Sequence, residues 1–186
     1  TGIDAAGCTV CQMNNVENIV NGNAVSPATI TMTAGAGARA SVSVANSLET
    51  YPSGSFAGFD IESASLLSGS LLASLDITLY NKGVEVQSGS GQSLLAGAGS
   101  SLITGSPDRQ VVGIISRVPF DEVQMNIRAL AGADLGIIKI YNTYVQKTCA
   151  LPVGCNFSRL MNRTADDAEV DAAHTGVRGG VCAGCL

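Results

Sequence analysis

Hydrophobic and polar residues alternate with a period of two along much of the chain, and this alternation predicts half-buried antiparallel β-strands. In residues 28–33, for example, threonines separate Ile30 from Met32, so that the two apolar side chains share one face. The predicted strands are residues 28–33, 38–45, 55–62, 73–80, 84–87, 110–116, a strand from Phe120 through Ile127, and 136–145. The residues predicted to face the core are Ile30, Met32, Ala40, Val42, Val44, Phe59, Ile61, Leu75, Ile77, Leu79, Val123, Met125 and Ile127.

Turn-forming residues separate these strands. Gly35-Ala-Gly37 and Tyr51-Pro-Ser-Gly54 predict turns, and Asn81-Lys82-Gly83 predicts a hairpin because Asn and Gly tolerate positive φ. Residues 88–107, rich in Ser, Gly and Leu, predict a long loop, and no segment has a convincing helical period. About eight strands with regular turns predict an all-β fold, an antiparallel two-sheet sandwich of the jelly-roll kind. An immunoglobulin-like sandwich is the alternative, but no Cys…Trp…Cys pattern supports it.

Composition narrows the class of protein further. The 186 residues are 46% hydrophobic, which excludes wholesale disorder, and only 13% are charged. Small polar residues in place of Lys and Glu, together with six cysteines, indicate an extracellular, oxidising location. The start Thr1-Gly2-Ile3-Asp4 lacks the features of a signal peptide, so we expect a mature or excised segment.

Charge and hydropathy argue against two classes of partner. The net charge of −5 supplies no basic surplus to neutralise phosphates, which argues against nucleic-acid binding. No apolar run reaches the roughly 18 residues of a membrane helix, so we expect no membrane insertion. The chain has no Trp and few other aromatic residues, so it offers few rings on which a bound sugar could stack.

The two ends of the chain resemble each other. Thr1-Gly2-Ile3 and the later Cys8-Thr-Val-Cys11 match Thr175-Gly176-Val177 and Cys182-Ala-Gly-Cys185 without a gap, at an offset of 174 positions. Two Cys-x-x-Cys pairs in register indicate one repeat of a tandem array. The other interpretation is a standalone domain with a separate staple at each end.

This repeat and the change in composition after Lys147 predict the domain organisation. We expect an N-terminal Cys-x-x-Cys joint at residues 1–11, a β-sandwich repeat domain at 12–147, a cysteine-containing connector at 148–174, and the start of the next repeat at 175–186. The connector contains two Asn-x-Ser/Thr sequons, at Asn156 and Asn162, which are surface glycosylation acceptors if the source modifies asparagine.

The cysteines are predicted to form structural disulfides. The candidates are Cys8, Cys11, Cys149, Cys155, Cys182 and Cys185, and the sequence does not fix their pairing. Cys149 and Cys155 bracket a short loop that a disulfide could close, or they could bridge to the following Cys-x-x-Cys. A Cys₄ zinc site of Cys149, Cys155, Cys182 and Cys185 is the alternative, although its spacing departs from standard zinc ribbons. Redox catalysis by a Cys-x-x-Cys motif would need a thioredoxin-like βαβ unit, and the sequence predicts no such unit.

The sequence predicts no enzyme, no cofactor and no metal site. His174 is the single histidine and a Ser-His-Asp triad would need it, but we expect a solvated linker residue. Asp60 and Glu62 share one strand face and could bind a cation or act as a carboxylate pair, yet a solvated face is the simpler expectation. Asp121 and Glu122 are a second acidic pair, and the glycines near residues 35–37 and 97–99 lack the Lys-Ser/Thr of a phosphate loop.

Several phrases resemble a known family. The segment Cys8 to Thr29, with Val20-Asn21-Gly22-Asn23, resembles the opening of repeat units in very large Bacteroidetes surface proteins. Tyr51 to Phe59, Leu79 to Gly83 and Phe120 to Val123 are further matches, so the resemblance covers roughly residues 1–147. It implies a type IX-secreted adhesin or filament, gliding-motility adhesins included, built from jelly-roll repeats. Relatives often carry Asp where this chain has Asn21, so no calcium site is carried over.

Together these observations predict a disulfide-cross-linked structural repeat of an extracellular cell-surface filament or giant adhesin that mediates surface attachment or motility. Its partners would be neighbouring copies of the same repeat, with surface glycans as further candidates. The alternatives are a small secreted subunit that polymerises non-covalently into a filament, and a carbohydrate-binding sandwich module whose loops, such as 88–107, hold the ligand.

Overall fold

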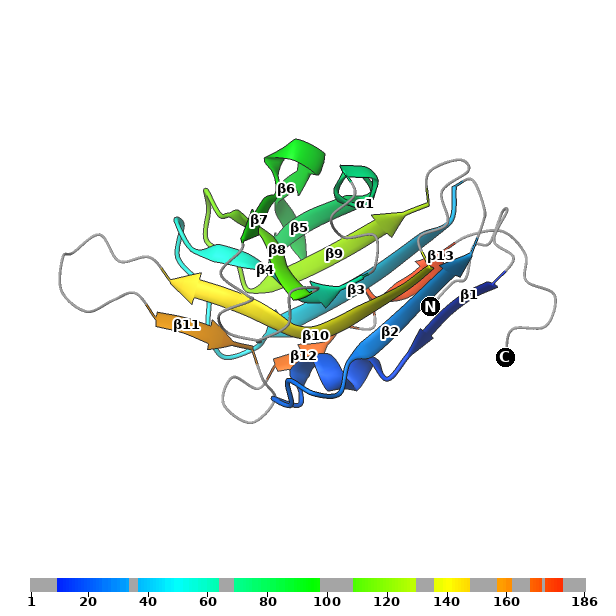
Figure 1. Ribbon diagram of the computed structural model, residues 1–186. Coiled ribbons are helices and arrows are strands. Elements are labelled where there is room, and N and C mark those ends of the chain that lie inside the picture. Colours follow the sequence, from blue (N-terminus) through cyan, green and yellow to red (C-terminus); the bar gives the residue numbers. More distant parts are fainter. Residues whose placement is uncertain are drawn as a thin grey trace.

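A computed structural model describes residues 10–33, 37–63, 69–97, 109–129, 136–147, 157–161, 168–171 and 173–178. Within them, thirteen strands form two antiparallel sheets that lie face to face (Figure 1). The all-β two-sheet fold expected from the alternating pattern is therefore confirmed.

The first sheet has seven strands. Its order is β1 (Val10–Asn14), β2 (Ala28–Thr33), β10 (Gly136–Lys147), β4 (Phe56–Glu62), β8 (Arg109–Ile115) and β7 (Leu95–Gly97), and β11 (Phe157–Leu160) pairs with β10. The second sheet has six strands. Its order is β12 (Ala168–Val170), β3 (Arg39–Asn46), β9 (Glu122–Arg128), β5 (Leu75–Asn81) and β6 (Val84–Ser90), and β13 (Gly176–Arg178) pairs with β3.

The strand order has the jelly-roll arrangement. In the first sheet β2, β10, β4 and β8 are neighbours, and in the second sheet β3, β9, β5 and β6 are neighbours. Along the chain, β2, β3, β4 and β5 therefore alternate between the sheets, and β8, β9 and β10 return between the strands already laid down. This alternation places sequence-distant residues on adjacent strands.

The core lies between the sheets and contains the residues that the alternation places inward. Every predicted inward residue from Ile30 to Ile127 is buried, with an exposed fraction of 2% or less. Tyr51 and Phe120 add an aromatic pair, with ring centroids 5.2 Å apart, at an isolated β-bridge. The short 3₁₀ helix η1 (Val16–Val20) contacts β2, β10 and β12 and buries Ile19 and Val20 at the edge of this core.

The predicted hairpin is present, with one difference in its details. Lys82 and Gly83, with φ of 52° and 75°, are the residues at positive φ between β5 and β6, and Asn81 still belongs to β5. The Lys82 backbone N–H donates to both carboxylate oxygens of Asp121 at 3.0 Å. These hydrogen bonds to the Asp121 side chain compensate for the strain of Lys82, a non-glycine residue at positive φ.

Three expectations from the sequence are corrected. The loop predicted over residues 88–107 is partly regular, since β6 continues to Ser90 and is followed by the 3₁₀ helix η2 (Gly91–Ser93) and β7. A short helix, α1 (Gly69–Ser74), precedes β5, although no helix was predicted. The connector predicted over residues 148–174 contains β11 and β12, which hydrogen-bond to β10 and β3, so the described part of this segment belongs to the sandwich.

Strands also lie across or beyond the two ends predicted for the sandwich and its connector, at residues 11/12 and 174/175. β1 spans the boundary drawn between residues 11 and 12, because Cys11 pairs with Met32 of β2. β13 lies in the segment predicted to start the next repeat, yet it pairs with β3 of the same chain. Short strands of three or four residues carry too few positions for alternation to be recognised in the sequence.

Candidate functional site

A cluster of ionisable side chains lies on the outer face of the six-stranded sheet. The His174 Nδ1 atom is 2.9 Å from Oε1 of Glu122 and 2.7 Å from Oδ2 of Asp171. Glu122 is buried, with an exposed fraction of 3%, whereas Asp171 and His174 are partly exposed. Among the described residues, these three form a group whose imidazole nitrogen and carboxylate oxygens lie close enough together to share a metal ion.

The fold brings the cluster together from two sides. Glu122 begins β9, and its neighbour in the sheet is Ala45 of β3. Asp171 and His174 lie in the turn between β12 and β13, the two short strands that both pair with β3. Because both ends of this turn are held by the same strand, the turn is fixed against the face from which Glu122 projects.

Ser43 anchors this turn and also contacts Glu122. Its carbonyl accepts a hydrogen bond from the Asp171 backbone N–H at 3.0 Å, and its own N–H donates to Oγ1 of Thr175 at 2.9 Å. The Ser43 hydroxyl donates to Oε1 of Glu122. One residue therefore holds both the turn and the buried carboxylate.

The imidazole ring is fixed by packing. It stacks on the ring of Tyr80 from β5, with centroids 4.5 Å apart and an interplanar angle of 20°. Nε2 of Gln124 donates to the His174 carbonyl at 2.6 Å, and the Tyr80 hydroxyl donates to Oε1 of the same glutamine at 3.0 Å. His174 is therefore a packed residue, and the expectation of a solvated linker histidine is wrong.

Burial and charge set the pKa values of the cluster. Burial raises the pKa of Glu122, and the hydrogen bond from Ser43 and the charge of His174 only partly oppose this effect. Burial alone would lower the pKa of His174, but the charges and hydrogen bonds of Glu122 and Asp171 outweigh it, so the pKa is raised.

The cluster does not have the geometry of a catalytic triad. In a triad the serine hydroxyl is hydrogen-bonded to the histidine, which removes its proton during attack. Here the Ser43 hydroxyl donates to Glu122, and the histidine nitrogen described above faces two carboxylates. The arrangement is therefore suited to holding a cation or a proton between Glu122 and Asp171.

The acidic pair Asp60 and Glu62 lies on the outer face of the other sheet, where cationic side chains engage both residues. Asp60 forms an ion pair with Arg109, and both side chains are less than one tenth exposed. Glu62 accepts hydrogen bonds from Nζ of Lys139 and from the hydroxyl of Tyr141, both at 2.6 Å. The Arg109 guanidinium also lies 3.5 Å from the Tyr141 ring centroid.

This arrangement corrects two hypotheses about the pair. Asp60 has an exposed fraction of 5%, so it is not on a solvated face, and the two carboxylates are paired with different cations instead of sharing one. Burial raises the pKa of Asp60 against the opposing effect of Arg109. Hydrogen bonds from Lys139 and Tyr141 lower the pKa of Glu62, and burial and that carboxylate raise the pKa of Tyr141 to about 12.

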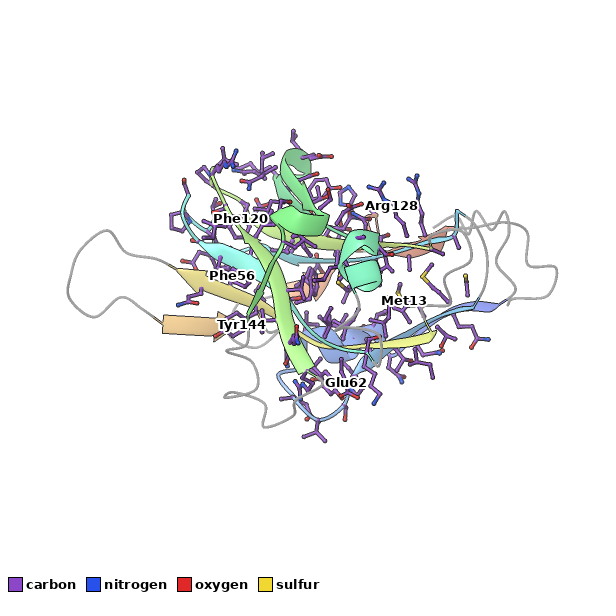
Figure 2. All side chains as sticks on the ribbon, turned by 45° about the horizontal axis from the view of Figure 1, so that its top comes forward. Met13, Phe56, Glu62, Phe120, Arg128 and Tyr144 are labelled. Atoms are coloured by element: carbon purple, nitrogen blue, oxygen red, sulfur yellow. The ribbon has the colours of Figure 1, made fainter. Side chains whose placement is uncertain are left out.

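Figure 2 labels Glu62 and Arg128, which project outward from different sheets. Arg128 forms an ion pair with Asp76 on the outer face of the six-stranded sheet. In both sheets, charged residues of neighbouring strands therefore pair across the outer face, as cross-strand neighbours of opposite charge do.

The remaining candidate residues from the sequence do not form a shared site among the described residues. Asp121 caps the hairpin at Lys82, while its neighbour Glu122 belongs to the histidine cluster, so they do not form a carboxylate pair. Cys11 is buried and disulfide-bonded. The cysteines Cys8, Cys149, Cys155, Cys182 and Cys185 lie outside the described residues, as do Asn156 and Asn162 and most of the two glycine-rich segments.

A pocket of about 300 Å³ lies between the edges of the two sheets, where β6 faces β8. It is lined by Gln87, Ser88, Gly89, Ser93, Ile114, Ile115 and Arg117. Gln87 spans this junction, since its side chain donates to the Ile115 carbonyl at 3.0 Å and accepts from the Arg117 N–H at 2.6 Å. Part of the lining comes from the segment that the sequence predicted as a ligand-binding loop, but it includes no aromatic ring.

Sequence reasoning missed the partners that define both clusters, namely Ser43, Tyr80, Arg109 and Tyr141. Each occupies an outward position of a predicted strand, or adjoins one, where a polar residue is ordinary. The rarity of charge in this chain was the available signal, since an arginine or a histidine beside a strand is conspicuous when few residues are charged. Strand pairing, which the sequence does not give, was needed to connect them.

Among the described residues, no helix is long and apolar enough to cross a membrane. Comparisons with protein-family models, with curated proteins and with solved structures found no match to this chain.

Proposed function

We propose that the chain is a structural repeat unit of an extracellular surface filament or giant adhesin, cross-linked by disulfides and serving surface attachment or motility. The observation that carries this proposal is the ungapped match between residues 1–11 and 175–185, which places two Cys-x-x-Cys pairs in register at an offset of 174 positions. A chain that repeats its own opening at an offset of about one domain length is typical of a tandem array.

The placement of the first and last described strands supports a joint between successive units. β1 and β13 contact each other, although they are separated by most of the chain (Figure 1). The first and the last described strands of the chain therefore lie next to each other in the sandwich. Cys11, which belongs to the first Cys-x-x-Cys, lies in β1 and is disulfide-bonded, which favours a role for these cysteines in stapling that region.

The outer faces of the two sheets also favour a structural role. Among the described residues, charged side chains on these faces pair with one another within the domain, as Arg109 does with Asp60 and Lys139 does with Glu62. The resemblance to repeat units of Bacteroidetes surface proteins points in the same direction, toward a secreted chain at the cell surface. Neighbouring copies of the repeat are the partners that this function needs.

Two alternatives have specific observations in their favour. A separate secreted subunit that assembles non-covalently would use the short strand β13, which occupies the edge of β3 and has the same opening phrase as the N-terminus. A carbohydrate-binding module would use the pocket beside Gln87 and Arg117. The lack of aromatic rings in that pocket makes it the weaker of the two.

The size of the native polypeptide separates the first two hypotheses. Protein from the source cells is boiled in SDS with excess reductant, and peptides are mapped across Leu186. We expect a band far above the 18.8 kDa of this chain, with peptides that continue from Cys185-Leu186 into a segment resembling residues 12 onward. A single band at the size of this chain, ending at Leu186, would defeat the tandem proposal in favour of a separate subunit.

The carbohydrate alternative is tested separately on a glycan array with the folded, oxidised chain. A bound glycan whose signal is lost in Arg117→Ala and kept in Arg128→Ala would favour the binding module. Arg128 is a suitable control because it is also an exposed arginine but lies outside the pocket.

A further inference from the structure

We propose that Glu122, Asp171 and His174 form a binding site for one divalent transition-metal ion, with Zn²⁺ as the best match. The site is additional to the structural role proposed above and does not depend on it. Its donor atoms are one imidazole nitrogen and two carboxylate oxygens, which all lie within 4.8 Å of one another.

The spacing of the donors fits such an ion. Zn²⁺ binds imidazole nitrogen and carboxylate oxygen at about 2.0–2.2 Å, so tetrahedral ligands are separated by roughly 3.3–3.5 Å. The Nδ1 atom of His174 is now 2.9 Å and 2.7 Å from the two carboxylate oxygens. Small side-chain movements of about half an ångström would therefore admit the ion.

The protonation of the histidine leaves one of these contacts unexplained. Nδ1 carries at most one hydrogen, and a single N–H cannot be directed well at two carboxylate oxygens at once. Both oxygens are nevertheless within hydrogen-bond distance of that nitrogen. A cation placed between the three atoms satisfies the nitrogen lone pair and both oxygens together.

Charge balance favours a divalent ion over a proton. Two ionised carboxylates with a protonated His174 carry a net charge of −1, and among the described residues no lysine or arginine forms an ion pair with Glu122 or Asp171. A divalent ion with a neutral imidazole brings the net charge to zero. Because Glu122 is almost fully buried, this neutralisation removes an unfavourable charge from a poorly solvated position.

The residues around the ligands hold them as the outer shell of a metal site does. The Ser43 hydroxyl donates to Glu122, and the Ala173 backbone N–H donates to Oδ1 of Asp171 at 2.8 Å, which leaves Oδ2 facing the histidine. Stacking on Tyr80 fixes the plane of the imidazole. Ligating carboxylates and histidines in metalloproteins are oriented by hydrogen bonds of this kind.

The donor set also indicates the class of metal. Ca²⁺ takes six to eight oxygen ligands, and a site with an imidazole and two carboxylates suits Zn²⁺ or a similar borderline ion instead. Three protein ligands leave a fourth position for water. The ion would join β9 to the turn between β12 and β13, and so would fasten the C-terminal segment to the sheet.

The test uses the complete 186-residue chain with its disulfides intact, free thiols alkylated and metals removed with EDTA. Zn²⁺ is titrated in a calorimeter, and His174 is then treated with diethyl pyrocarbonate with and without Zn²⁺. Because His174 is the only histidine, the modification reports on this residue alone. We expect one Zn²⁺ per chain, protection of His174 from modification, and slower hydrogen exchange in residues 168–178.

Variants identify the ligands. His174→Gln and Asp171→Asn should weaken Zn²⁺ binding by more than the roughly 10- to 100-fold that outer-shell substitutions cost, and Ser43→Ala should fall within that range. Glu169→Gln is the matched control, because this exposed carboxylate lies on β12 two residues before Asp171 and outside the cluster. Circular dichroism checks that each variant folds. Glu122→Gln should also lose Zn²⁺ binding, but it alters a buried residue. If that variant does not fold, Asp171→Asn, at a partly exposed position, still tests the site.

Three results would overturn the proposal. The first is the absence of Zn²⁺ binding to the wild-type chain. The second is binding that persists in His174→Gln, or binding that is seen only when the free thiols are left unalkylated, which would assign the metal to other groups. The third is an equal loss of affinity in Glu169→Gln and Asp171→Asn, which would indicate a nonspecific acidic surface.

Discussion

Replacing Gly58 with alanine should destabilise the sandwich, because backbone of the neighbouring strand occupies the space that the methyl group needs. Gly58 of β4 lies opposite Gly113 of β8. A Cβ atom at Gly58 would be 2.2 Å from the Val112 carbonyl oxygen and 2.6 Å from the Gly113 Cα atom. Real Cβ atoms essentially never come closer than 3.0 Å, and backbone cannot rotate away as a side chain can, so β4 and β8 must separate.

The expected cost follows from two contributions. Overpacking of a well-packed region costs about 1–3 kcal/mol. Separating the strands also weakens the hydrogen bonds that flank the pair, each worth about 0.5–1.5 kcal/mol. With two such bonds affected, Gly58→Ala should lower the free energy of unfolding by about 2–6 kcal/mol. For a domain of this size, each kcal/mol lowers the melting temperature by roughly 2–4 °C.

An aromatic ring contacts one of these two glycine positions, which adds to the tight packing. A Cβ at Gly113 would lie 2.7 Å from Cζ of Phe56, and the Phe56 ring meets Tyr144 edge-on with centroids 6.5 Å apart (Figure 2). Tyr144 is the neighbour of Gly58 on the other side of β4. Rings laid over strand glycines compensate for the missing side chains, so Gly113→Ala would displace Phe56 as well as β4.

Urea unfolding of the oxidised chain measures the effect, and Gly89→Ala is the matched control. The nearest neighbours of a Cβ at Gly89 would be side-chain atoms, Cγ2 of Ile114 at 2.8 Å and Oγ of Ser93 at 3.1 Å, so smaller shifts relieve these contacts than the 2.2 Å backbone contact at Gly58. We expect a clearly smaller loss for Gly89→Ala, with an unchanged dependence on urea in both variants. Equal stabilities of wild type and Gly58→Ala would refute the reasoning, since they would mean that β4 and β8 are not in this close register.

Three further predictions concern polar groups of the seven-stranded sheet. Arg109→Met leaves the buried Asp60 carboxylate unpaired and should lower the free energy of unfolding by about 3–5 kcal/mol. The double variant Asp60→Leu/Arg109→Met should recover most of this loss, because it removes both charges. An equal loss in the double variant would contradict the ion pair between Asp60 and Arg109. The pKa of Glu62 is lowered from its usual value of 4.5, so its ion pair should add stability above that pH and lose it as the pH falls through the lower folded-state value. The difference in melting temperature between wild type and Glu62→Gln should therefore shrink on acidification, and a difference independent of pH would count against the pairing. Thr143→Val should raise the urea midpoint by an amount equivalent to about 1 kcal/mol, because the buried Thr143 hydroxyl has no hydrogen-bond partner in the described part of the chain; a loss of stability would indicate that the hydroxyl is bonded.

The fold class and the long strands could be predicted from the sequence because they depend on local alternation. Residues 28–33, 38–45 and 73–80 each place their apolar side chains at every second position, and each of these segments overlaps an observed strand whose inward residues are buried. The hairpin at residues 81–83 could be predicted for the same reason, since its turn chemistry lies within three consecutive residues.

The short strands and the histidine cluster could not be predicted in this way. β12 and β13 have three residues each, too few to show a period, and they are strands only because the free edge of β3 supplies their hydrogen bonds. His174 acquires its environment through the same pairing, which brings it against Glu122, 52 positions earlier in the chain. From the sequence alone, a single histidine in a polar segment had no visible partner.

The side chains that face the core can therefore be identified from the amino-acid sequence, because burial follows from a period of two along each strand. The contacts between outward-facing side chains depend on strand order and register, so they become apparent only in the folded domain. The glycine pair of β4 and β8, the ion pair of Asp60 with Arg109 and the cluster around His174 all join residues from strands that are distant in the chain. Their chemistry is a consequence of the jelly-roll order, which interleaves the later strands between the earlier ones.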